Sequence, residues 1–102
     1  MNFVYITGKI YNIESYEDCI LFRVRVTEPS GSYSIKCRAY GNLIRYVQSE
    51  LLEYDDVCVQ GKLIARTYKL DDDSGFRYTA EIKARFISKL VQMEYGAYYD
   101  EK

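Results

Sequence analysis

Residues 57–68 read VCVQGKLIARTY, and the alternate positions from Val57 to Ala65 are all apolar or glycine. A period of two predicts a strand that buries one face, here formed by Val57, Val59, Gly61, Leu63 and Ala65. A glycine inside a strand suits the tight bends of a small barrel. The stretch therefore predicts a long strand in a closed, barrel-like sheet.

Four further segments show the same alternation, and they cover residues 3–10, 19–27, 34–40 and 76–86. Between the third and fourth strands the period changes to that of a helix, which Asn42 is expected to cap. Turn-forming residues at 28–32 and 71–75 separate the strands of two hairpins. Three strands, a helix and two strands follow the order of an OB-fold, an all-β, five-stranded Greek-key barrel with one helix between strands 3 and 4. Another small α+β domain would also fit this pattern.

The length of 102 residues permits one domain with one modest core. We expect the OB-fold domain over residues 1–91 and a short tail over 92–102, loose because residues 94–102 lack periodicity. No apolar run reaches the roughly 18 residues of a membrane-spanning helix, and the first residues lack a signal-peptide pattern. We therefore expect an intracellular protein without a membrane partner.

The chain contains no histidine, and Cys19, Cys37 and Cys58 form no CxxC pair. A zinc site would lack good ligands, so we expect no metal or other cofactor, and cysteines that act as small buried apolar side chains. The absence of histidine also removes the usual general base and the Ser/His or Cys/His pairs of nucleophilic catalysis. The sequence therefore argues against an enzyme.

The net charge is only −1, but the charges are segregated along the chain. Glu81 is the one acidic residue clearly inside a predicted strand. The outward positions of the strands carry Lys9, Arg23, Arg25, Lys36, Arg38, Lys62, Arg66, Arg77, Lys83 and Arg85. Such a surface can bind a phosphate backbone and release its counterions. The alternative is that these side chains only solvate the strands and protect their edges.

Two tyrosines accompany these charges. Tyr40 shares a predicted face with Lys36 and Arg38, and Tyr68 shares one with Lys62 and Arg66. Exposed rings beside cations form a platform on which unpaired bases stack, at roughly 1–3 kcal/mol per base. Duplex DNA does not present its base faces, so the pattern favours single strands. For the tyrosines at positions 5, 11, 33 and 78 we expect ordinary packing.

Four motifs, in the same order along the chain, resemble the bacterial single-stranded DNA-binding proteins of the SSB type over residues 2–90. They are NFVYITGKI at 2–10, YGNL at 40–43, VCVQGKLIARTY at 57–68, and a glycine at 75 followed by YTAEI at 78–82. The resemblance implies an OB-fold, assembly into homodimers or homotetramers, and DNA wrapped over basic and aromatic faces. It places base-stacking rings at Tyr40 and Tyr68 and phosphate contacts at Lys36 and Arg66.

The chain also departs from the family pattern. Ser34 stands at a position in the third strand where the family stacks a base, and the hairpin at 29–32 lacks an expected aromatic residue. Tyr54 and Asp55 replace a lysine–glycine pair before the fourth strand. The acidic tip with a terminal phenylalanine, through which the family recruits other enzymes, has no counterpart in residues 98–102, so that role is not carried over.

The sequence thus predicts sequence-independent binding of single-stranded DNA in replication, recombination or repair. The candidate site consists of Tyr40, Tyr68, Lys36, Arg38, Lys62, Arg66, Arg23 and Arg25. The expected partners are single-stranded DNA, further copies of the chain in a homodimer or homotetramer, and replication proteins. Two alternatives stay open: a protein-interaction or accessory replication module with weak nucleic-acid binding, and an RNA-binding OB domain.

Overall fold

The computed structural model of the protein describes residues 1–71 and 75–100, apart from the side chains of Tyr68, Phe76, Tyr78 and residues 92–94. Residues 72–74 of the predicted turn at 71–75 therefore lie outside the described residues. The elements follow in the order β1 (Val4–Ser15), β2 (Ile20–Glu28), β3 (Gly31–Ala39), α1 (Asn42–Glu50), β4 (Asp56–Lys69), β5 (Phe76–Lys89), the 3₁₀ helix η1 (Leu90–Tyr95) and β6 (Ala97–Tyr98).

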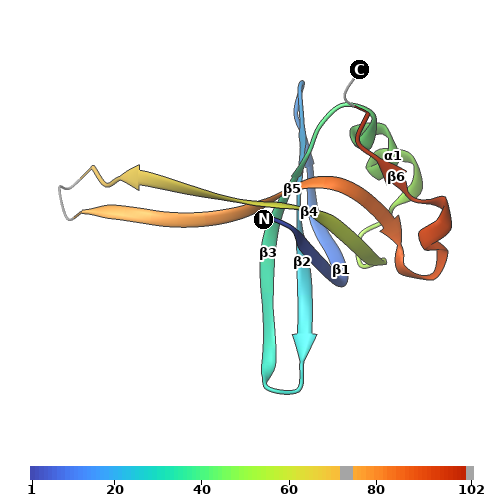
Figure 1. Cartoon of the computed structure of the whole chain (residues 1–102), viewed down its shortest axis with the longest axis horizontal. Coiled ribbons are helices and arrows are strands. Elements are labelled where there is room, and N and C mark those ends of the chain that lie inside the picture. Colours follow the sequence, from blue (N-terminus) through green and yellow to red (C-terminus); the bar gives the residue numbers. More distant parts are fainter. Residues whose placement is uncertain (72–74, 101–102) are drawn as a thin grey trace.

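The strands form one sheet in the order β3-β2-β1-β4-β5-β6, and neighbours in this order run antiparallel. The first half of β1 pairs with β4 and its second half with β2, so β1 joins the two parts of the sheet. The barrel closes where β3 and β5 pair in parallel, with Cys37 opposite Ile82. The predicted five-stranded OB-fold with a helix between β3 and β4 is confirmed (Figure 1).

The core lies inside the barrel and under the helix. All five long strands contribute predicted inward residues to its buried centre, and α1 adds Leu43 and Val47 to the same cluster. Val4, Ile6, Val26 and Ile35, also predicted to face inward, are only partly buried. Cys19, Cys37 and Cys58 are buried free thiols, as expected from the sequence. The buried aliphatic side chains are the main source of stability, at roughly 25 cal/mol per Å² of apolar surface removed from water.

Two glycines allow the strands to cross closely. A Cβ atom on Gly8 would overlap the carbonyl oxygen of Arg25, and one on Gly61 would overlap that of Lys83. The β4–β5 register also shifts by a bulge between Gln60 and Gly61. The sharp bend predicted from Gly61 is therefore present, and glycine is required there for close backbone approach.

Beyond Gly61 the prediction that one face of β4 is buried is wrong. Leu63 and Ala65 are exposed, as is Ala80 on the neighbouring β5. The distal halves of β4 and β5 project from the barrel as a long hairpin (Figure 1). The alternation predicts a strand here, but it does not reveal that the barrel ends before the strand does.

The prediction of a loose C-terminal tail is wrong for the tail residues that the structure describes. Gly96 packs closely on Phe86 and Ser88, and β6 adds a short antiparallel strand to β5. The Asn42 side-chain amide donates to the Tyr98 carbonyl at 2.7 Å, and the Asp100 amide donates to Asn42 Oδ1 at 2.8 Å. A strand of two residues is too short to show a period, so the sequence pattern does not reveal it.

This use of Asn42 also corrects the predicted helix cap. Gly41, at φ 60°, occupies the N-cap position of α1, and no side chain caps the helix there. Gly41 tolerates the left-handed conformation, and the Tyr99 ring lies close above it. The side chain of Asn42 instead ties α1 to the C-terminal segment. In the described residues, no helix has the length and apolar character needed to cross a membrane.

Candidate functional site

Strand pairing gathers basic side chains on one outer surface of the sheet. Arg23 of β2 lies opposite Lys36 of β3, and the parallel β3–β5 pairing sets Arg38 opposite Lys83. Lys83 in turn lies opposite Lys62 of β4. We call this surface the basic face; it comprises Arg23, Lys36, Arg38, Lys62, Arg66 and Lys83. Five of the eight predicted site residues therefore share one surface.

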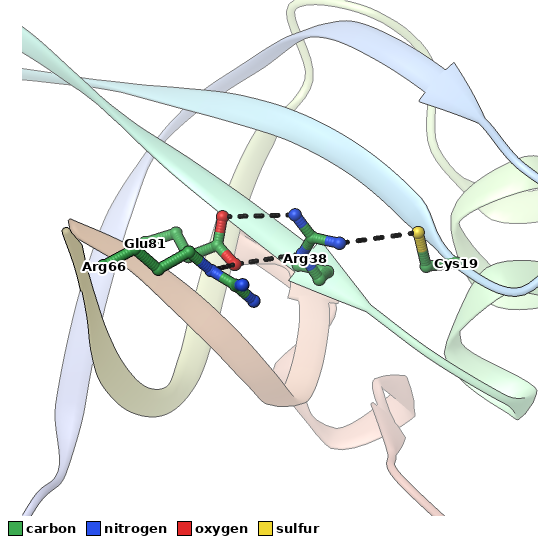
Figure 2. Close-up of polar contacts among 4 residues, drawn as sticks. All are labelled: Cys19, Arg38, Arg66 and Glu81. Atoms are coloured by element: carbon green, nitrogen blue, oxygen red, sulfur yellow. Dashed lines mark hydrogen bonds and ion pairs between the residues drawn. The ribbon is translucent and has the colours of Figure 1, made fainter. Parts of the chain in front are cut away.

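One carboxylate, that of Glu81, is buried among these cations. Arg38 Nε donates to Glu81 Oε1 at 3.0 Å and its Nη2 reaches Oε2 at 3.5 Å, while Arg66 Nε donates to Oε1 at 3.1 Å. Figure 2 shows Arg38 lying between Glu81 and Cys19, whose sulfur is 4.0 Å from Arg38 Nη1. We call Glu81, Arg38 and Arg66 the clamp. It ties β3, β4 and β5 together where the barrel closes.

The clamp stabilises the charged form of Arg38. Burial by itself would lower the pKa of Arg38, but the hydrogen bonds and charge of Glu81, and then Tyr40, raise it above its ordinary value. Arg38 is therefore a permanent cation that is largely engaged by Glu81, with 23% of its side chain exposed. Arg66 is more accessible, at 41%. Of these two predicted phosphate contacts, Arg38 has the clearer structural role.

The thiol of Cys37, one residue before Arg38 in β3, is inert. Burial, and then the negative charge of Glu81, raises the pKa of Cys37 far above its ordinary value. Only a thiolate reacts readily or binds metal, so Cys37 has a packing role. The described residues also contain no cluster of three or more Cys, Asp or Glu side chains placed to hold a metal ion.

An open groove runs beside the clamp, between β3 and the projecting β4–β5 hairpin. Arg23 and Lys36 line one side of it, and Arg77 and Thr79 line the other, with Glu81 at the base. The two hairpins that border it, β2–β3 and β4–β5, diverge from the barrel at a wide angle (Figure 1). Neither Arg23 nor Lys36 forms an ion pair within the described residues, so both can accept a phosphate.

Of the two predicted stacking tyrosines, the structure describes the side chain of one, Tyr40. Tyr40 follows β3 directly, is half-buried, and has the Lys83 ammonium 5.3 Å from its ring centroid. This cation–π contact holds a charge against the ring. The backbone of Tyr68 pairs with Arg77 near the end of β4, but its side chain lies outside the described residues. Its stacking role stays a prediction.

Arg25 does not line the groove but lies next to it, opposite Ser34 and beside Tyr11. Its guanidinium carbon is 5.3 Å from the Tyr11 ring centroid. The sequence pattern ended the first strand at Ile10 and assigned Tyr11 to ordinary packing. The structure continues β1 to Ser15 through a register shift after Tyr11. Tyr11 itself lies before the shift, on the same outer surface as Lys9. Tyr11 follows outward-facing Lys9 by two residues, and this spacing is the sequence signal that could have revealed its outward position.

Comparison with solved structures identifies the fold. The mitochondrial single-stranded DNA-binding protein Rim1 of S. cerevisiae matches 86% of this chain and 93% of its own at a TM-score of 0.78 and 13% identity. A small single-stranded DNA-binding protein from Streptomyces coelicolor matches 88% and 95% at 0.70 and 21% identity. Plasmodium falciparum SSB, in complex with single-stranded DNA, matches 81% and 85% at 0.65 and 17% identity.

These likenesses show that the chain has the fold of SSB proteins, as the sequence motifs led us to expect. No family model and no curated protein matches the chain. The three-dimensional arrangement is therefore shared with these proteins at identities of 13–21%.

Proposed function

We propose that the protein binds single-stranded DNA without sequence preference and without catalysis. The observation that carries this proposal is the groove between β3 and the β4–β5 hairpin, with Arg23, Lys36 and Arg77 along its sides. Its base is a carboxylate already neutralised by two arginines. Among the described residues that line the groove, Glu81 is the only acid and it is buried, so the groove offers positive charge to a phosphate backbone.

Bases would stack on the rings beside this groove. Tyr40, backed by the Lys83 ammonium, lies at one end of the basic face. The predicted second ring is that of Tyr68, on the projecting hairpin. Every base has a flat π-face, so stacking combined with phosphate contacts binds all sequences similarly. Lys62 and Arg66 would extend the phosphate path toward the hairpin.

The similar solved structures support this reading, since all three belong to proteins named for binding single-stranded DNA and one contains that ligand. By extension we propose an intracellular role in replication, recombination or repair. Further copies of the chain, in a homodimer or homotetramer, and replication proteins are the partners we propose with it.

The test is fluorescence anisotropy of a labelled oligo-dT of about 35 nucleotides, long enough to cover more than one OB domain. The matching duplex and an oligo-rU are measured beside it at low and moderate salt. We expect tight, salt-sensitive binding of the DNA single strand and weak binding of the duplex. Tighter binding of oligo-rU would favour the RNA-binding alternative instead.

A matched pair of variants makes the test specific. Arg23→Gln removes a cation from the groove, whereas Arg45→Gln removes an exposed one from α1, away from the basic face. We expect Arg23→Gln to weaken binding and lower the salt slope by about 0.7, the value for one phosphate contact on a single strand. Arg45→Gln should bind like the unaltered protein. No binding even at low salt would contradict the proposal and favour a protein-interaction module.

A further inference from the structure

A second concavity lies on the outer surface of β1 and β2, beside the groove. It is lined by Lys9, Tyr11, Arg25 and Tyr54. Lys9 and Arg25 lie opposite each other in the β1–β2 pairing, so two cations flank two phenol rings. Cations beside exposed rings are the groups that bind a nucleotide unit, through its phosphate and its base.

Tyr11 connects this concavity to the groove. A hydrogen bond from Ser34, together with contact and charge from Arg25 and charge from Arg23, lowers the pKa of Tyr11 despite its partial desolvation. Ser34 also lines the groove, as does Arg23. In the strand pairing, Tyr11 of β1 lies opposite Arg23, and Ser34 of β3 lies opposite Arg25. The groove and the concavity therefore meet at Tyr11 and Ser34.

Tyr54 provides the second ring from the loop between α1 and β4. Its amide donates to the Ile10 carbonyl at 2.6 Å, and the Ile10 amide donates to the Asp55 carbonyl at 3.0 Å, so the loop is fixed to β1. Tyr54 has φ 73°, which is costly for a residue with a bulky side chain. Tyr54 is nonetheless 67% exposed, so burial does not hold it there.

The charge of the concavity suits an anionic strand. Lys9 forms an ion pair with Asp56 at 3.1 Å, and both side chains are more than half exposed. Arg25 forms no ion pair within the described residues and lies over the Tyr11 ring. A planar guanidinium is itself a surface on which a base can stack. The described residues that line the concavity include two cations and no acid. Of the nearby carboxylates, that of Asp56 pairs with Lys9, and those of Glu53 and Asp55 accept from the backbone amides of Asn12 and Leu52.

We propose that this concavity, the Tyr11 site, binds a further nucleotide of the same single strand that occupies the groove. The strand passes over Ser34 and Tyr11, with a base against Tyr11, Arg25 or Tyr54 and a phosphate near Lys9 and Arg25. This inference rests on the proposed single-strand binding. The Tyr11 ring of β1 would supply, beside Ser34 of β3, the stacking surface that a serine lacks.

Affinity and contact mapping test the Tyr11 site together. Tyr11→Leu removes one ring, and Tyr54→Asn removes the other while keeping a residue that tolerates positive φ. Binding of oligo-dT to each variant is compared with that of the unaltered protein. Contacts are mapped by photo-crosslinking the same oligonucleotide carrying 5-iodouracil, followed by mass spectrometry of the crosslinked peptides.

Loss of one stacked base predicts a decrease in affinity of roughly tenfold for each variant. Tyr11→Phe, which keeps the ring, should restore the affinity lost in Tyr11→Leu. The control is Tyr95→Leu, because Tyr95 is 73% exposed but lies in η1, outside the basic face. It should bind like the unaltered protein. Crosslinks are expected at Tyr11 or Tyr54 as well as in the groove.

The outcomes separate the two proposals. If the unaltered protein binds oligo-dT, but Tyr11→Leu and Tyr54→Asn bind equally well and crosslinks lie only in the groove, the Tyr11 site is wrong and single-strand binding stands. If the unaltered protein binds no oligo-dT, both proposals fall. Urea unfolding of each variant shows whether a loss of affinity reflects lost folding, and rescue by Tyr11→Phe excludes that cause.

Discussion

The clamp and the groove lie side by side on the basic face, yet their cations are in different states. Arg38 and Arg66 are held by a buried carboxylate, whereas Arg23 and Lys36 form no ion pair within the described residues. A cation engaged by a buried acid stabilises the fold, because removing either partner leaves the other uncompensated. An accessible cation beside a groove contributes little to stability and is available to a ligand. The same residue types on one surface therefore serve two different purposes.

The largest effect is expected from the acid of the clamp. Glu81→Gln removes the charge that both arginines face, and we expect the free energy of unfolding to fall by about 3 kcal/mol. Urea unfolding measures this loss. Glu50→Gln, at an exposed position of α1, is the control and should change stability by less than about 0.5 kcal/mol. A loss from Glu81→Gln no larger than the control's would mean that the clamp does not stabilise the barrel.

Arg38→Gln tests the other side of the clamp. Arg66 would still face Glu81, so we expect a smaller loss of stability, about 2 kcal/mol. The affinity of the folded variant for single-stranded DNA should change little, because Arg38 is engaged by Glu81 rather than by the ligand. A stable Arg38→Gln protein with strongly reduced affinity would reverse the roles assigned to clamp and groove.

Tyr40 lies next to both regions, with Lys83 over its ring. Tyr40→Leu should lower the affinity for oligo-dT by roughly tenfold, the effect of one lost stacking contact. Tyr46→Leu on α1 is a control for the general loss of a tyrosine, since Tyr46 packs against the core. It should lower stability without changing the affinity of the folded protein. Unchanged affinity of Tyr40→Leu would remove Tyr40 from the binding face.

Lys36→Gln gives the smallest expected effect. One lost phosphate contact should reduce affinity by a few-fold at moderate salt and lower the salt slope by about 0.7. Stability should change by less than about 0.5 kcal/mol, because no described ion pair involves this side chain. Anisotropy titrations at several salt concentrations, beside urea unfolding, check both parts. A clear loss of stability would show that Lys36 belongs to the clamp.

The sequence predicts the barrel well because its evidence is local. Alternation along each strand and the helical spacing after Asn42 give the order of elements directly, and Gly8 and Gly61 predict where strands cross closely. Features without a local period were missed. The bulge after Tyr11, near Asn12 at φ 55°, interrupts the alternation, so the continuation of β1 to Ser15 was not recognised.

The site could be predicted only in part for a similar reason. Charge patterning located the basic residues, but the clamp depends on the parallel β3–β5 pairing, which brings together residues 43 positions apart. Nothing near Glu81 in the sequence indicates that it is buried beneath Arg38 and Arg66. Likewise, the ring of Tyr11 reaches Ser34 only because β1, β2 and β3 lie side by side.

The most direct test of the separate roles of clamp and groove is the salt dependence of single-strand affinity in two variants. One carries Arg23→Gln with Lys36→Gln, and the other carries Arg38→Gln. If the groove binds the phosphates, the double variant lowers the slope of log K against log salt by about 1.4, two contacts at 0.7 each, and Arg38→Gln leaves the slope unchanged. An unchanged slope in the double variant, or an equal decrease in Arg38→Gln, would contradict the account.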